Sequence, residues 1–89
     1  MRFEWDSEKA EVNLAKHGVA FEEAVEVFLD PNALEEFDQL HSDQEPRFRR
    51  LGLSSRRLLL VVFVERIQET MRILSARKAT AKEQALYEE

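Results

Sequence analysis

The chain has 89 residues, of which 44% are hydrophobic and 35% charged, with a formal net charge of −5. This length allows one modest hydrophobic core, so we expect residues 1–89 to form a single domain. The absence of cysteine excludes disulfides and thiolate chemistry, and the longest apolar run, residues 58–64, is far shorter than the roughly 20 residues of a membrane span. We therefore expect a soluble protein of the cytoplasm that contacts no membrane.

The N-terminal residues predict a short strand followed by a helix. Residues 3–6 alternate apolar and acidic side chains, as a strand with one buried face does. Asp6 or Ser7 can cap a helix that runs to about His17, because their side-chain oxygens accept hydrogen bonds from free backbone N–H groups. Gly18 can end this helix in the left-handed conformation.

Apolar residues recur at helical spacing between positions 21 and 29 and predict a second helix, which ends at Asp30-Pro31. Thr80 and Glu83 form a capping-box pattern and predict a last helix that runs through Tyr87. Four strands are expected between these helices, over residues 33–37, 47–53, 58–64 and 71–76, with a polar loop at 38–46.

This order of elements predicts an α+β fold. Helices that precede a run of strands favour a small antiparallel sheet with two N-terminal helices and one C-terminal helix, all on one face. The Leu- and Val-rich segment 58–64 is expected to be the central strand, buried on both sides. The turn at 65–69 contains neither glycine nor asparagine.

Charge is divided unevenly along the chain. Residues 1–46 hold three basic and thirteen acidic residues, a net charge of −10, whereas residues 47–89 hold ten basic and five acidic residues, a net charge of +5. Such a dipole can present a basic face to a phosphate backbone. An uneven scatter of solvated charges explains it equally well.

The first candidate site lies on the first helix, where Lys9, Asn13 and Lys16 share one face. His17 follows at the helix C-terminus, where the helix dipole favours a protonated imidazole. These side chains could bind a phosphate and transfer a proton. The simpler interpretation is a solvated lysine face with a capping histidine.

Arginines of the central strands and their turns form the second candidate site, since planar guanidinium groups bind phosphate through two hydrogen bonds. Neighbouring strands could display several of them on one sheet face, although charges on strands also prevent edge-to-edge aggregation. The set comprises Arg47, Arg49, Arg50, Arg56, Arg57 and Arg72.

The third candidate site is the segment Ser75-Ala76-Arg77-Lys78, which precedes the capped last helix. Cations at this end of a helix are unfavourable for the helix itself, so they point to a bound phosphate. The alternative is that Arg77 pairs with a local carboxylate such as Glu83.

The fourth candidate site is the loop that holds Asp38, His41, Ser42 and Asp43. One histidine and scattered aspartates are too few for a metal site, so no metal and no cofactor are expected. A Ser-His-Asp triad lacks the Gly-x-Ser-x-Gly turn that usually presents the serine.

The combined pattern resembles the BrnT-type toxin family, whose members are RelE-like ribonuclease toxins of type II toxin–antitoxin systems. The resemblance covers nearly the whole chain. It rests on Phe3-Glu4-Trp5-Asp6, Lys9, Asn13, Lys16-His17-Gly18-Val19, Phe21-x-x-Ala24, Phe28-x-Asp30-Pro31, His41-Ser42, Glu45-x-Arg47, Arg72 through Ala79, Glu83 and Tyr87-Glu88.

The resemblance implies a RelE-like fold and a metal-independent endoribonuclease that arrests growth. In such an enzyme the ribose 2′-OH attacks the adjacent phosphorus, so a base must take its proton. His17 is the candidate base, with Glu65 the weaker choice, while Lys16, Arg72 and Arg77 would stabilise charge on the phosphate. The expected RNA-binding residues are Arg47, Arg49, Arg50, Lys78 and Tyr87.

The resemblance also implies a BrnA-like antitoxin that binds the toxin, forms a hetero-oligomer with it and connects it indirectly to operator DNA. An alternative is a catalytically weak RelE-like module that acts mainly as partner and co-repressor of a DNA-binding antitoxin. An unrelated RNA-binding domain is the third possibility, although the aromatic residues of the second helix lie on its core face and offer no stacking platform.

Overall fold

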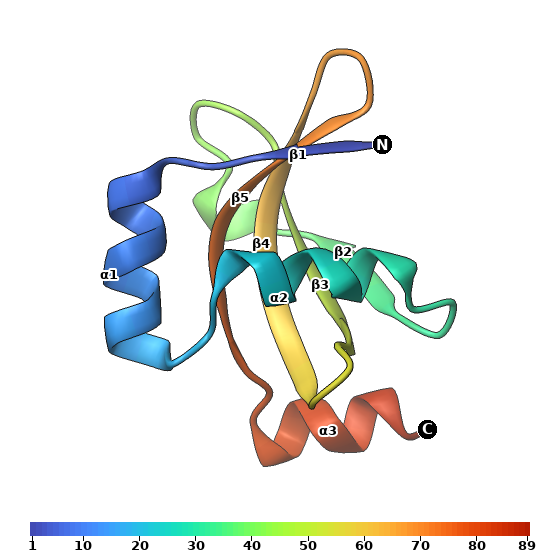
Figure 1. Ribbon diagram of the computed structural model, residues 1–89. Coiled ribbons are helices and arrows are strands. Elements are labelled where there is room, and N and C mark those ends of the chain that lie inside the picture. Colours follow the sequence, from blue (N-terminus) through green and yellow to red (C-terminus); the bar gives the residue numbers. More distant parts are fainter.

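The computed structural model describes residues 1–89 as an α+β fold with one five-stranded sheet (Figure 1). None of the helices has the length and the apolar composition of a membrane-spanning segment. The order of elements matches the order expected from the sequence. The elements are β1 (Arg2–Glu4), α1 (Ser7–His17), α2 (Phe21–Val25), the 3₁₀ helix η1 (Glu26–Leu29), β2 (Leu34–Phe37), the 3₁₀ turn η2 (Gln39–His41), β3 (Arg47–Leu53), β4 (Leu58–Arg66), β5 (Thr70–Lys78) and α3 (Ala81–Tyr87).

The sheet is mixed, which corrects the expectation of a purely antiparallel sheet. Its strand order is β1-β5-β4-β3-β2, so β4 lies at the centre as predicted. Strands β2 to β5 pair antiparallel, but β1 runs parallel to β5, with Arg2 opposite Thr70. This pairing joins segments almost 70 residues apart in sequence, and no local pattern encodes it.

The predicted end signals of the helices are present. The Asp6 side chain accepts a hydrogen bond from the Lys9 N–H at the start of α1, and Gly18 ends α1 with a φ of 70°. The second helix differs from expectation, because its last four residues tighten into η1. A Cβ on Gly52 of β3 would lie 2.9 Å from Val27 Cγ1, so glycine is what allows η1 to pack this closely on the sheet.

One face of the sheet is covered by α1, α2 and η1, and the core lies between them. Phe28 of η1 links the two layers, since its ring lies 4.9 Å from Phe3 and 4.8 Å from Phe63 between centroids. The buried core residues are Val19, Phe21, Ala24, Val27, Leu59, Val61, Ile73 and Ala76.

Asn13 closes the part of the β5 edge that β1 leaves uncovered. Strand β1 pairs only with residues 70–72. Beyond it, the buried Asn13 side chain accepts from Ala76 N–H (3.1 Å) and donates to the Ala76 carbonyl (2.8 Å) and the Val19 carbonyl (3.0 Å). The amide thus replaces a strand residue, so Asn13 stabilises the fold rather than belonging to an exposed polar stripe.

The C-terminal helix α3 lies at one end of the sheet and does not join the other helices on their face (Figure 1). None of its residues is buried. Two attachments hold it: Glu83 pairs with Arg77 of β5, and the Tyr87 hydroxyl donates to Asp30 Oδ2 (2.6 Å). The expectation that all helices share one face is therefore wrong for α3, because polar attachments rather than an apolar face fix its place.

Candidate functional site

The sheet face opposite α1, α2 and η1 carries four arginines from β3 and β5. Residues that pair directly across neighbouring strands point to the same face. Arg47 and Arg72 both pair with Val64, Arg49 pairs with Val62, and Arg77 pairs with Leu60. Val62, Val64 and Leu60 alternate with the core residues of β4, so the arginines point away from α1, α2 and η1. We call Arg47, Arg49, Arg72 and Arg77 the arginine face.

Three of these four arginines are neutralised by carboxylates of the same chain. Arg49 pairs with Glu36 of β2, and Arg72 Nη1 lies 2.7 Å from Glu4 Oε2 of β1. Arg77 makes two hydrogen bonds to Glu83, of 2.8 and 2.9 Å. Arg47 forms no ion pair, so its positive charge is the one on this face available without competition.

The Arg77–Glu83 pair stays ionised over a wide pH range. The hydrogen bonds between the two groups raise the pKa of Arg77 above its usual value and hold the pKa of the Glu83 carboxyl below its usual value. This pairing was the alternative considered for Arg77 from sequence. It leaves both guanidinium and carboxylate charged at the edge of the arginine face.

Arg50 lies on the opposite face of β3. Its guanidinium donates to the backbone carbonyls of Val27 and Asp30, at 3.1 and 3.2 Å, and its Nη1 lies 3.1 Å from Glu35 Oε1. The group also lies over the Phe28 ring, 5.5 Å from its centroid. These contacts tie η1 to the sheet and separate Arg50 from the other strand arginines.

Arg57 is likewise placed away from the arginine face. It binds the buried Glu23 carboxylate through two hydrogen bonds, and Arg56 lies 3.8 Å from the same group. Both arginines belong to the turn between β3 and β4. The second candidate group from sequence therefore divides, with Arg47, Arg49 and Arg72 on one face and Arg50, Arg56 and Arg57 elsewhere.

His17 and Lys16 line a separate groove between α1 and the β5 edge, together with Ser75. Ser75 pairs with Val62, so it connects this groove to the arginine face. No hydrogen bond orients the His17 ring. Lys78 lies farther along β5 and lines a hollow with Tyr87 at the end of the sheet.

Ser42 continues the β2–β3 ladder with its side chain. The Asp38 N–H donates to the Arg47 carbonyl (2.8 Å), as in a strand pair. The returning bond is replaced by the Ser42 hydroxyl, which accepts from the Arg47 N–H (2.9 Å) and donates to the Asp38 carbonyl (2.5 Å). The loop 38–47 is thereby fastened at its base, directly beside the arginine face.

Asp38 and His41 form a hydrogen-bonded pair in this loop. His41 Nδ1 lies 3.1 and 3.2 Å from the two carboxylate oxygens of Asp38. The Asp38 side chain is only 8% exposed, whereas the His41 side chain is 66% exposed. From the sequence, Asp38 and His41 are considered as metal ligands or triad members, and His41 also as part of the family pattern, but not as a pair. The spacing Asp-x-x-His, which matches one 3₁₀ turn, is the signal that could have found the pair.

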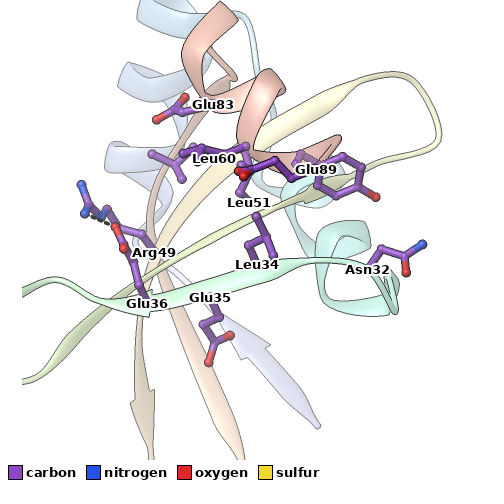
Figure 2. A pocket seen from close by; sticks show the side chains of 11 residues that line it. Asn32, Leu34, Glu35, Glu36, Arg49, Leu51, Leu60, Glu83 and Glu89 are labelled. Atoms are coloured by element: carbon purple, nitrogen blue, oxygen red, sulfur yellow. Dashed lines mark hydrogen bonds and ion pairs between the residues drawn. The ribbon is translucent and has the colours of Figure 1, made fainter.

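A cleft of about 700 Å³ separates α3 from strands β2, β3 and β4 (Figure 2). Its floor is apolar and includes Leu34, Leu51 and Leu60, which lie on the same side of the sheet as the arginine face. Leu86 and Tyr87 contribute from α3. The remaining lining residues are Asn32 and the charged residues Arg49, Glu35, Glu36, Glu83 and Glu89, so the rim is mainly acidic.

Comparisons with known proteins agree with this geometry. A sequence model of the family described as "Ribonuclease toxin, BrnT, of type II toxin-antitoxin system" matches residues 5–83. The fold is similar to the crystal structure of the Brucella abortus ribonuclease toxin, BrnT, with a TM-score of 0.69 and 27% sequence identity. That likeness covers 90% of this chain and 97% of the Brucella chain. A search of curated proteins found no match.

Proposed function

This chain belongs to the BrnT family of ribonuclease toxins of type II toxin–antitoxin systems, and from that premise we propose that it is a cytoplasmic, metal-independent endoribonuclease that arrests growth until its antitoxin binds. The observation that carries the proposal is the arginine face, where Arg47, Arg49, Arg72 and Arg77 project from the side of the sheet opposite α1, α2 and η1. The helix-and-sheet arrangement supports grouping the chain with RelE-like toxins.

The proposed reaction is attack by a ribose 2′-OH on the adjacent phosphorus. A base takes the 2′ proton, the new O2′–P bond forms, and the P–O5′ bond breaks to release a protonated 5′-oxygen. Arg72 and Arg77 would stabilise the charge that develops on the phosphoryl oxygens. The resemblance implies His17 as the base, and Lys16 either as a further group that stabilises this charge or as one that assists the leaving oxygen. Both line the groove that Ser75 connects to the arginine face.

The main attraction for RNA would be between the arginine side chains and the RNA phosphates. Arg47 and Arg49 lie on the arginine face and suit contacts to the phosphates on either side of the scissile bond. Arg50, Lys78 and Tyr87, the other expected contacts, lie off this face, so they would bind only RNA that leaves it. The path of the RNA therefore runs over β3, β4 and β5.

The test combines growth with cleavage. The chain is expressed in a bacterial host, alone and with the neighbouring reading frame, while growth and RNA integrity are followed. We expect arrest and RNA loss from the wild type, rescue by a BrnA-like neighbour, and at least a roughly 10²-fold loss of cleavage in Arg72→Ala/Arg77→Ala.

Arg56→Ala is the matched control, because Arg56 is exposed in a turn away from the arginine face. Equal loss in the control and the double variant would contradict the assigned site. Intact RNA and normal growth with the folded wild type would contradict the ribonuclease itself.

The second candidate is a weak nuclease that serves mainly as partner and co-repressor with a DNA-binding antitoxin. Two observations favour it: carboxylates neutralise three of the four arginines, and the apolar cleft beside α3 suits a protein segment. Under this alternative, the chain forms a hetero-oligomer with the antitoxin and strengthens operator binding while RNA stays intact.

A further inference from the structure

The loop between β2 and β3 holds a histidine in a fixed orientation. Asp38 is buried and accepts from His41 through both carboxylate oxygens, at 3.2 and 3.1 Å. Because an ionised carboxylate can only accept, this contact places a proton on Nδ1 of the ring. The Nε2 lone pair of the neutral imidazole is then directed away from Asp38, on a side chain that is 66% exposed.

Hydrogen bonds at the base of this loop also fix its position relative to β3. The Ser42 hydroxyl bridges the Asp38 carbonyl and the Arg47 N–H, and Asp38 N–H donates directly to the Arg47 carbonyl. His41 lies one residue before this bridge and lines a hollow with Arg47. The imidazole therefore lies next to the one arginine of the arginine face that has no ion pair.

Arg47 belongs to a row that crosses the sheet to Arg72, with Val64 between them. Their Cα atoms are separated by two strand spacings, roughly 10 Å. Two long arginine side chains can contact one phosphate across such a span. A phosphodiester bound there would have the His41 ring at one end of the row.

From these contacts we propose that His41 is the catalytic base of the ribonuclease and that Asp38 and Ser42 are its positioning residues. The assignment rests on the proposed ribonuclease function. His41 Nε2 takes the 2′-OH proton as the O2′–P bond forms. The P–O5′ bond breaks, O5′ takes a proton from water, and the imidazolium returns its proton to the resulting hydroxide. The products are a 2′,3′-cyclic phosphate and a 5′-OH.

His17, the other histidine of the chain, lacks both features. Its ring has no hydrogen-bond partner, and its groove opens beside β5 rather than beside Arg47. An unoriented imidazole loses efficiency as a base, because the productive tautomer and ring angle are only part of its population. The hydrogen bonds to Asp38 fix the tautomer and the ring angle of His41, so His41 does not lose efficiency as a base in this way.

The experiment measures cleavage of a labelled single-stranded RNA of mixed sequence by the purified full chain. We expect His41→Ala to lower kcat by about 10² to 10⁴-fold, with KM for RNA changed less than about 3-fold. Added imidazole should restore part of the His41→Ala activity, which a purely structural role would not allow. Asp38→Asn should lower kcat by about 10-fold or more, without rescue by imidazole.

Gln39→Ala is the matched control, since Gln39 is exposed on the same turn and its side chain makes no hydrogen bond. Thermal unfolding of each variant separates loss of fold from loss of chemistry. Wild-type kcat in folded His41→Ala, or a loss confined to His17→Ala, would overturn the assignment while leaving the ribonuclease intact. An inert wild type would instead overturn the proposed function.

Discussion

At the scale of single residues, Glu23 shows how a buried charge is stabilised. Its carboxylate receives hydrogen bonds from Arg57 and from the Ser54 hydroxyl. The hydrogen bond from Arg57 lowers the pKa of Glu23 below its usual value, although burial opposes this change. A carboxyl with a lowered folded-state pKa stabilises the fold above its unfolded pKa, and this stability is lost as the pH falls through the folded value.

Glu23→Gln should therefore reduce the free energy of unfolding at pH 7 by about 1–3 kcal/mol, because Arg57 loses its ionised partner. The difference between wild type and variant should shrink as the pH is lowered from 5 to 3. Urea unfolding across this range measures both effects. A constant difference at every pH would show that the charge of Glu23 contributes nothing. Glu22→Gln, at an exposed neighbouring position, is the control.

The candidate site was partly predictable at this scale. Alternation along residues 47–53 places Arg47 and Arg49 on one side of a strand and Arg50 on the other, and the structure shows this division. Sequence spacing could not tell which side the helices cover, so Arg50 was grouped with the others. The Asp38–His41 contact was also missed, because the short 3₁₀ turn that creates it lies within a polar segment with no periodicity.

At the scale of elements, the helix caps and the antiparallel run of strands agree with prediction, whereas the parallel pairing of the first strand does not. The caps at Asp6, Gly18 and Thr80 depend on residues within four positions, and all three are present. The parallel pairing of β1 with β5 depends on packing across the whole chain. The turn between β4 and β5 contains Gln68 and Glu69 with φ of 59° and 55°, a left-handed conformation that the absence of glycine argues against.

Asn13→Ala tests how α1 is attached to the sheet edge. The substitution removes three hydrogen bonds and leaves the buried N–H and carbonyl of Ala76 without partners. We expect the free energy of unfolding to fall by about 3 kcal/mol, measured by urea denaturation. Val12→Ala, at the exposed preceding position, should change it by less than about 0.5 kcal/mol. Similar values for both variants would contradict the edge-closing role.

At the scale of the whole molecule, carboxylates of the chain neutralise much of the positive charge of the arginine face. The acidic N-terminal half supplies Glu4 and Glu36, which neutralise Arg72 and Arg49 of the basic C-terminal half. Folding therefore places acidic residues of the first half against basic residues of the second half, so the two halves do not form separate acidic and basic poles. RNA must compete with these carboxylates for the guanidinium groups.

Glu36→Gln should therefore strengthen RNA binding, because it frees the Arg49 guanidinium while keeping the size of the side chain. We expect the Kd for single-stranded RNA to fall by about 3- to 10-fold, and the salt dependence of log K to steepen by about 0.7. Fluorescence anisotropy at several salt concentrations measures both. Glu22→Gln, which removes a charge on α2 across the sheet, is the comparison. Equal gains in both variants would point to net charge alone.

The two attachments of α3 also predict which positions should change together in the sequences of related proteins. Glu83 at its first turn and Tyr87 at its last are anchored to Arg77 and Asp30. Substitution of one partner alone would release one end of the helix, so each pair should be inherited as a unit and change together. The exposed positions between these anchors carry no such constraint and should drift.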